Sequence, residues 1–192
     1  MAADPIVRFR RWFAEAVRAG IDLAEAAALA TADQRGRPSV RYVLLKGVER
    51  RSFVFYTNST SRKGLELAAR PYAALAFYWH TTGRQVRVEG RVEGVSERDA
   101  DAYWAERPRE SQIASVASDQ GKSLSSRSEL LGAYRRLTRE YEGHPVPRPP
   151  HWTGYRILPE RIEFWTRHEP RLHHRELFVR GRSGWTRTLL QP

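Results

Sequence analysis

The stretch RYVLLKGVERRSFVFYTNSTSRKG, residues 41–64, decides the fold and site predictions because two apolar strand patterns in it end in polar residues. The basic and hydroxyl side chains at the strand ends are Arg41, Lys46, Tyr56, Thr57, Ser59, Ser61, Arg62 and Lys63. The run SRKG predicts a helix start, where free N–H groups and the positive end of the helix dipole favour an anion. A phosphate site is predicted, and two hairpin strands with solvated basic ends are the alternative.

Lysine usage also points to this stretch. Thirty of the 33 basic residues are arginine, and two of the three lysines, Lys46 and Lys63, lie between residues 41 and 64. A lysine retained in such a chain indicates a need for a compact point charge on a flexible stem.

Length and composition predict one soluble domain over residues 1–192, since 41% of the residues are hydrophobic and 29% are charged. The absence of cysteine excludes disulfides, thiolate metal ligands and a cysteine nucleophile, and it favours a reducing compartment. No run approaches the roughly 20 apolar residues that span a bilayer. We therefore expect a cytoplasmic protein that is neither secreted nor bound to a membrane.

The net charge of +11 raises the alternative of nucleic-acid binding, because basic domains attract polyanions. The arginines are scattered over nearly every segment, and no zinc-finger spacing, RNP-type aromatic motif or basic zipper is present. We therefore predict no nucleic-acid partner.

The hydrophobic periodicity predicts helices and many short strands. Expected helices cover 1–20, with Asp4 as N-cap and Pro5 in the first turn, and then 61–70, 96–107, 111–117 and 126–142. Expected strands cover 27–32, 38–46, 53–57, 72–79, 84–95, 152–158, 161–166, 174–180 and 184–190. A proline-rich connector, 143–150, precedes the C-terminal strands in 151–192.

Short, mostly antiparallel strands with helices between them predict an α+β barrel, in which closure of the sheet removes its edges. Neither a GxGxxG motif after a strand nor a Walker A run is present. Strand ends and side chains must therefore hold any nucleotide.

A second group of phosphate-type donors lies in AYWAERPRESQ: Tyr103, Arg107, Arg109, Ser111 and Gln112. The alternative is that Tyr103 and Trp104 form the buried face of a helix whose arginines are solvated, and spacing alone favours this alternative.

The segment EFWTRHEPRLHHRELF places Trp165 on a strand and Arg171, His173 and Arg175 at alternating positions. Alternating residues share one face of an extended segment, which fits either a ligand face or an exposed edge. The histidines lack zinc-ligand spacing, so no metal site is predicted. The polar groups bind and orient, which indicates that a cofactor supplies the chemistry.

Taken in order, the runs RYVLLK, FYTNSTSRKG, FYWHTTGRQV, RPRESQI, RIEFWTRHEPRLHHR and LQP resemble the pyridoxamine 5′-phosphate oxidase family. The resemblance implies an FMN-binding split β-barrel that works as a homodimer with FMN at the subunit interface. It implies FMN contacts from Arg41, Tyr42, Val43, Leu44, Leu45, Lys46, Tyr56, Thr57, Arg62, Lys63, Gln85, Gln120, Trp165 and Arg175. It implies substrate contacts from Lys46, Tyr103, Arg107, Ser111, Arg171 and His173.

The implied reaction is oxidation of pyridoxamine or pyridoxine 5′-phosphate to pyridoxal 5′-phosphate by hydride transfer from C4′ to N5 of FMN. Oxygen then reoxidises the flavin and gives hydrogen peroxide, while Arg171 and His173 orient the reacting end of the substrate. Two alternatives are a related FMN oxidase of phenazine-type metabolism and a non-enzymatic flavin- or nucleic-acid-binding protein. The three phosphate-type donors Tyr103, Arg107 and Ser111 favour the vitamer, because a phenazine precursor carries no phosphate.

Three departures from the family pattern bear on the site. Gly121 stands where the family has a serine that contacts FMN, and Val116 stands where the family has a tryptophan. The N-terminal arm that helps to cover the substrate in the family is expected to be absent. These departures leave the substrate preference open.

Overall fold

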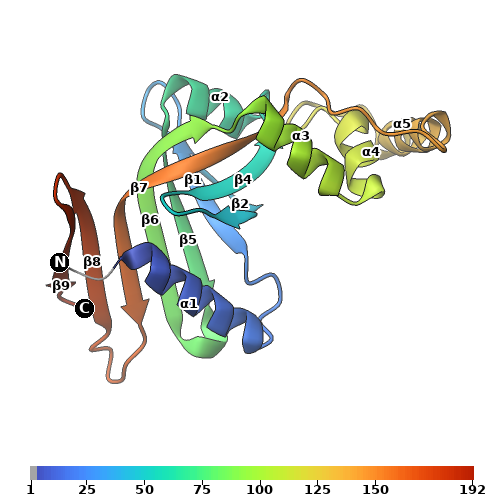
Figure 1. The fold of residues 1–192 in the computed structure, drawn as a ribbon. Helices are drawn as coiled ribbons and strands as arrows, with labels where there is room; N and C mark the ends of the chain where they lie inside the picture. The colour runs from blue at the N-terminus through green and yellow to red at the C-terminus, as the bar shows by residue number, and fades with distance from the viewer. Residues whose placement is uncertain (1–3) are drawn as a thin grey trace.

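The computed structural model describes residues 4–192, whose strands form one curled antiparallel sheet with helices around it (Figure 1). The helices are α1 (Pro5–Arg18), α2 (Arg62–Ala69), α3 (Glu97–Glu106), α4 (Arg109–Ala117) and α5 (Arg127–Glu140), with a 3₁₀ turn η1 at His80–Thr82. The strands are β1 (Ala26–Ala32), β2 (Pro38–Leu44), β3 (Gly47–Val48), β4 (Phe53–Asn58), β5 (Tyr72–Trp79), β6 (Arg84–Gly94), β7 (Trp152–Thr166), β8 (His174–Gly181) and β9 (Gly184–Leu190). The predicted α+β class is confirmed.

Helix α1 closes one end of the curled sheet (Figure 1). Its start is as predicted, because the Asp4 carboxylate accepts a hydrogen bond from the Ile6 N–H at 2.9 Å. The first three residues of the predicted helix 1–20 lie outside the described residues. Phe9 is fully buried, and its ring centroid lies 4.8 Å from that of Phe53 and 5.0 Å from that of Phe77. Burial of one such ring contributes about 1.5–3 kcal/mol, which holds α1 on the barrel.

The central strand β7 replaces two predicted strands. The sequence predicted separate strands at 152–158 and 161–166, and this division was wrong, because one strand runs through Pro159. A β-bulge shifts the register opposite Glu89 and Gly90 of β6, so the strand continues past the proline. A Cβ at Gly90 would lie 2.0 Å from the Leu158 carbonyl oxygen, so this close approach requires glycine.

Strand β7 divides the sheet between two sets of partners. Along most of its length it pairs with β6. Its first half also pairs with β4, and its second half also pairs with β8. The hairpin β8–β9 therefore extends the sheet at the end opposite β4 (Figure 1).

The barrel stays open, which corrects the prediction that closure removes its edges. The strand order is β2-β1-β5-β6-β7-β4-β3, so β2 and β3 are free edges on this path. The predicted strand 38–46 ends at Leu44, and the Lys46 N–H then donates to the Val54 carbonyl at 2.8 Å. The chain thus steps from one edge to the other, which gives a split barrel.

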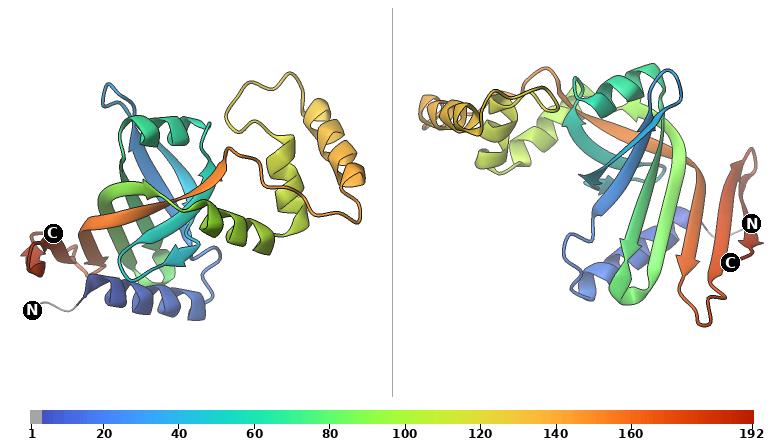
Figure 2. Two further views of the ribbon diagram at one scale, coloured as in Figure 1. Left: turned by 45° about the horizontal axis from the view of Figure 1, so that its top comes forward. Right: turned by 180° about the vertical axis from the view of Figure 1, so that it is seen from behind.

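Helices α3, α4 and α5 form a lobe that projects from the barrel (Figure 2). Its own small core contains Trp104, Ile113, Val146 and Trp152. The indole N–H of Trp104 donates to the Val146 carbonyl at 2.8 Å, which ties the proline-rich run 143–150 to the lobe. This run leads back to β7 at Trp152.

Candidate functional site

A cavity of about 510 Å³, here called the inner cavity, lies at the split between β2 and β4. Residues of β2, β4, α2, α3 and the loop before α5 line it. They are Arg41, Tyr42, Val43, Leu44, Lys46, Tyr56, Thr57, Ser61, Arg62, Lys63, Tyr103, Arg107, Gln120, Gly121 and Trp152. The stretch 41–64 and the segment around Tyr103, which are far apart in the sequence, therefore face one space.

Lys63 provides a buried cation at one end of the inner cavity. Its side chain is 8% exposed, and its Nζ donates to Ser61 Oγ at 3.0 Å and to Gln120 Oε1 at 2.9 Å. Within residues 4–192 these bonds go to neutral oxygens only. Burial, and then the nearby charge of Arg41, lowers the pKa of Lys63 to about 8. An anion in the cavity would counter both effects.

Two arginines reach the same end of the cavity from different elements. Arg41 extends from β2, and Arg62 lies in the first turn of α2. The buried Glu66 carboxylate accepts from Arg62 Nε at 2.8 Å and lies 3.4 Å from an Arg41 terminal nitrogen. The predicted anion site at residues 41–64 therefore consists of three cations arranged around one cavity.

Aromatic rings form a flat stack at the other end of the inner cavity. The Tyr56 ring lies 4.1 Å from the Tyr103 ring and 5.3 Å from the Trp152 ring, both in stacked geometry. Burial raises the pKa of both tyrosines, so their hydroxyls remain hydrogen-bond donors. Trp152 was not among the predicted site residues, although a tryptophan directly after the connector at the start of a strand was a usable signal.

Arg107 is only partly exposed and packs against an aromatic ring, in contrast to the solvated arginine of the alternative considered for its segment. Its guanidinium lies 4.7 Å from the centroid of the Trp152 ring and donates to Ser115 Oγ at 2.9 Å. Burial lowers the pKa of Arg107. Among the described residues, no carboxylate lies within ion-pair distance of this guanidinium. Arg107 therefore offers the cavity an uncompensated positive charge.

The other predicted donors of this segment do not line the inner cavity. Arg109 donates to the His144 carbonyl at 2.9 Å, and Gln112 donates to the Trp104 carbonyl at 2.6 Å. Both side chains stabilise the lobe. Ser111 lies on α4, and its carbonyl accepts from Ser115 Oγ at 2.8 Å.

A second polar cluster lies on β6, β7 and β8. The pairing places Gln85 opposite Trp165, and Trp165 opposite Arg175, in one row across three strands. The Trp165 and His173 rings lie 4.6 Å apart. Arg175 Nε donates at 2.9 Å to Glu163, a buried carboxylate that the sequence analysis did not single out. Of the three residues predicted to share one extended face, only Arg175 lies on a strand, because Arg171 and His173 belong to the loop before β8, where a turn bond links the Arg171 N–H to the His168 carbonyl; that prediction is wrong for these two residues.

Arg171 lies in the loop between β7 and β8 with a φ of 84°, a left-handed conformation that is strained for arginine. Its N–H donates to the His168 carbonyl at 3.0 Å. Neither this loop nor the row of Gln85, Trp165 and Arg175 lines the inner cavity. Leu45, another predicted contact, belongs to the hydrophobic core. One chain thus holds the predicted site residues in two separate places.

The two departures from the family pattern fall next to the inner cavity and in the lobe. Gly121 has a φ of 89°, and a Cβ there would have one neighbour within 4 Å, the Arg62 backbone nitrogen at 3.9 Å. The conformation favours glycine, and space for a side chain remains. Val116 packs against the lobe core.

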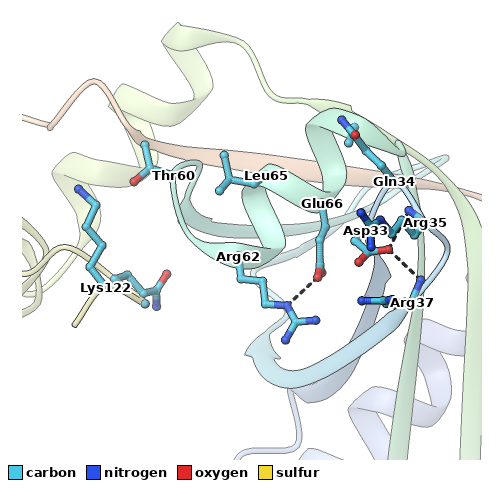
Figure 3. Close-up of a pocket in the computed structure, with 12 residues that line it drawn as sticks. Asp33, Gln34, Arg35, Arg37, Thr60, Arg62, Leu65, Glu66 and Lys122 are labelled. Carbon is cyan, nitrogen blue, oxygen red and sulfur yellow. Dashed lines mark hydrogen bonds and ion pairs between the residues drawn. The ribbon is translucent and has the colours of Figure 1, made fainter.

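A larger cavity of about 700 Å³, the outer cavity, adjoins the inner one and shares Arg62, Gln120 and Gly121 with it (Figure 3). The turn between β1 and β2 forms one wall, where Asp33 accepts from the backbone N–H groups of Arg35 and Arg37. The end of the inner cavity that carries Arg62 is therefore continuous with the outer cavity.

Two absences apply to the described part of the chain. Residues 4–192 contain no group of three histidine, cysteine, aspartate or glutamate side chains placed to hold a metal ion. None of the described helices has the length and apolar character needed to cross a bilayer.

Solved structures with this fold define the class of the protein. The PhzG protein of Burkholderia lata 383, solved with tetrahydrophenazine-1-carboxylic acid, aligns with a TM-score of 0.95 and 36% identity and covers 100% of this chain and 94% of its own. A pyridoxamine 5′-phosphate oxidase-related, FMN-binding protein of Nostoc punctiforme aligns with a TM-score of 0.78 and 21% identity over 96% of this chain and 97% of its own, a likeness of fold. The fold is that of the FMN-binding split-barrel proteins.

Sequence comparison narrows this class to a family. Residues 13–141 match the family model described as pyridoxamine 5′-phosphate oxidase. A "Pyridoxine/pyridoxamine 5′-phosphate oxidase" of Rubrobacter xylanophilus is 54% identical over 189 residues, which cover 98% of this chain and 87% of the relative. The chain belongs to the pyridoxamine 5′-phosphate oxidase family, as its sequence motifs predicted. It is therefore an FMN-dependent oxidase.

Residues 152–192 match a model described as the pyridoxine 5′-phosphate oxidase C-terminal dimerisation region, which supports the predicted homodimer. The inner cavity also fits FMN in chemical terms. The buried Lys63 lacks a carboxylate partner among residues 4–192 and suits a phosphate, while the apolar side chains of Val43 and Leu44 suit a flat ring system.

The lysine environment gives a direct test. In protein labelled with ¹³C at lysine Cε, we expect the Lys63 resonance of the apoprotein to titrate with a midpoint near pH 8. FMN should raise this midpoint, because a bound phosphate favours the charged ammonium. Lys63→Arg removes one of three resonances and assigns the signal. A midpoint above about pH 10, the ordinary lysine value, would contradict the burial argument.

Proposed function

We propose that the protein oxidises pyridoxamine 5′-phosphate and pyridoxine 5′-phosphate to pyridoxal 5′-phosphate, with oxygen as electron acceptor and hydrogen peroxide as product; oxidation of the amine also consumes water and releases ammonia. The observation that supports this proposal is the charge of Arg107, which faces the inner cavity without a carboxylate partner among the described residues. Tyr103 and Lys46 line the same cavity. These three groups suit a substrate phosphate at some distance from the Lys63 end.

The cavity then has two anion sites with different roles. Arg41, Arg62 and Lys63 hold the FMN phosphate at the α2 end. Lys46, Tyr103 and Arg107 hold the substrate phosphate near the lobe, and the predicted contact Ser111 lies on α4 one helix turn before Ser115, which accepts from Arg107. The remaining predicted FMN contacts are Tyr42, Val43, Leu44, Leu45, Tyr56, Thr57, Gln85, Gln120, Trp165 and Arg175. Two fixed phosphates set the register of the substrate ring on the flavin.

We place FMN at the interface of a homodimer. Gln85, Trp165, Arg171, His173 and Arg175 do not line the inner cavity of their own chain, so they would complete the cavity of the partner subunit. The edge strand β2 supports this arrangement, because Val40 is 69% and Tyr42 is 78% exposed beside the cavity.

Bound FMN supplies the hydride acceptor and passes the electrons to oxygen. The chain's own residues bind and orient the substrate. His173 Nδ1 accepts from the His168 backbone N–H at 3.2 Å, so neutral His173 carries its proton on Nε2 and can donate from that atom. Arg171 lies in the same loop with a left-handed backbone conformation. Neither residue has to remove a proton.

A second candidate function is oxidation of a phenazine precursor. Its support is the similarity to the PhzG protein, which was solved with tetrahydrophenazine-1-carboxylic acid. A carboxylate of such a ligand could pair with Arg107, whereas the Tyr103 and Lys46 donors around this arginine suit the three oxygens of a phosphate better.

Anaerobic mixing decides between the two candidates. FMN-loaded protein is mixed without oxygen with pyridoxamine phosphate, pyridoxine phosphate or a reduced phenazine carboxylate, and the flavin absorbance is followed. We expect the two vitamer phosphates to bleach the flavin band. Bleaching by the phenazine precursor alone would replace the vitamer proposal with the second candidate.

Arg107→Ala and Arg171→Ala should impair different kinetic constants of the oxidation. Arg107 is remote from the reacting carbon, so its loss should raise KM by up to about a hundredfold and leave kcat nearly unchanged. Arg171 acts at the reacting end, so its loss should slow flavin reduction even at saturating substrate. Single-turnover reduction of FMN-saturated enzyme measures both effects. Wild-type behaviour of both variants would contradict the assigned substrate orientation.

A mixed dimer tests whether each site uses both chains. Arg62→Ala damages the α2 end of a site, and Arg175→Ala damages the β8 row. Each variant alone should be impaired in both sites of its dimer. When the two are unfolded together and refolded, one site of each mixed dimer should be intact, and about half of the wild-type activity per mixed dimer should return. No gain over the separate variants would place both clusters in one chain's site.

A further inference from the structure

Glu66 occupies an unusual place for a carboxylate in a surface helix. It lies on α2, but its side chain is 5% exposed and turns toward β1 and β2 (Figure 3). The carboxylate accepts from Thr31 Oγ1 and from Ser39 Oγ, the latter at 2.5 Å. Two hydroxyls from neighbouring strands therefore fix its position under the helix.

The same carboxylate binds both arginines of the FMN phosphate end. Arg62 Nε donates to Oε1 at 2.8 Å, and an Arg41 terminal nitrogen lies 3.4 Å from Oε2. Arg41 is fixed further by a hydrogen bond to Thr31 Oγ1 at 2.5 Å. Each carboxylate oxygen thus holds one arginine, and the two arginines come from different elements.

Repulsion between like charges explains why a buried carboxylate is needed at this end of the cavity. Arg41, Arg62 and Lys63 all line the inner cavity, and without an anion their like charges would separate the flexible side chains. Burial opposes ionisation of Glu66, but hydrogen bonds from Ser39, Thr31 and Arg62 outweigh it and lower its pKa to about 2. The carboxylate therefore stays negative at neutral pH. The phosphate end keeps a net charge of about +2, which matches a phosphate dianion.

We propose that Glu66 is a positioning residue. It holds the Arg41 and Arg62 side chains where they can bind the flavin phosphate, and so sets the selectivity of the site for FMN over riboflavin. This role rests on the proposed function, in which these arginines bind the phosphate. Glu66 itself lies behind the arginines and acts through them.

The test compares FMN with riboflavin, because a purely structural role would weaken both equally. In Glu66→Gln, the amide keeps the shape and one acceptor oxygen but loses the charge. We expect the Kd for FMN to rise roughly tenfold or more, while the Kd for riboflavin changes less than about twofold. Fluorescence titration of the apoprotein with each flavin measures both constants.

Glu176→Gln is the matched control. Glu176 is also 5% exposed, its pKa is also lowered to about 2, and it pairs with Arg8 and Arg187, but it lines a different cavity. We expect its FMN-to-riboflavin ratio to stay at the wild-type value. An equal loss of selectivity in Glu176→Gln would overturn the positioning role, because it would reflect general loosening of the fold.

Ser39→Ala is a milder variant that decides the question if Glu66→Gln fails to fold. Ser39 links the carboxylate to Arg41 on a partly exposed edge strand, so its loss should weaken FMN binding a few-fold and leave riboflavin unaffected. An unchanged FMN-to-riboflavin ratio in both variants would overturn the proposal.

Arg41→Ala and Arg62→Ala separate this proposal from the proposed function. If either arginine variant loses FMN selectivity while Glu66→Gln keeps it, the role of Glu66 fails and the phosphate site stands. If neither arginine variant loses selectivity, the assignment of the phosphate end itself is wrong.

Discussion

Buried carboxylates bound by arginines are the interaction on which this arginine-rich chain depends. Glu66, Glu163 and Glu176 are each at most 5% exposed, and each accepts from arginines of at least two elements. They join α2 to β2, β6 to β8, and α1 to β9. Removal of an arginine leaves the buried carboxylate less compensated, but Arg62, Arg87 and Arg187 are partly solvated, so the cost is below the about 3–5 kcal/mol of a fully buried pair. In a chain of net charge +11, these contacts fix arginines that would otherwise repel one another.

The position of these contacts also organises the site. The Glu66 contact lies beside the inner cavity, and the Glu163 contact orients Arg175 at the far end of the sheet. The split barrel separates these ends within one chain, since β7 pairs with β4 in its first half and with β8 in its second. In the proposed dimer, each sheet would carry two half-sites, and pairing of two chains would bring unlike halves together.

Patterns within one segment were predictable, and contacts between segments were not. The alternation that places Val86 and Val88 on the buried face of β6 follows directly from the sequence, as does the cation cluster of residues 41–64. The predicted division of β7 around Pro159 was wrong because the bulge beside it depends on a neighbouring strand. Glu66 looks like a solvated helix residue in the sequence, and its burial follows only from the packing of α2 on β1.

The central position of β7 in the sheet determines when the strands can pair during synthesis of the chain. This strand is made after β4 and β6, and both of them pair with it. Until β7 is made, the nascent chain therefore carries two open strand edges, a state in which unpaired strands are prone to aggregate. The β2-β1-β5-β6 side and the β4-β3 side can join in one sheet only when β7 has emerged. A ribosome that stalls anywhere before residue 152 would release a chain that lacks the strand needed to join the two sides of its barrel.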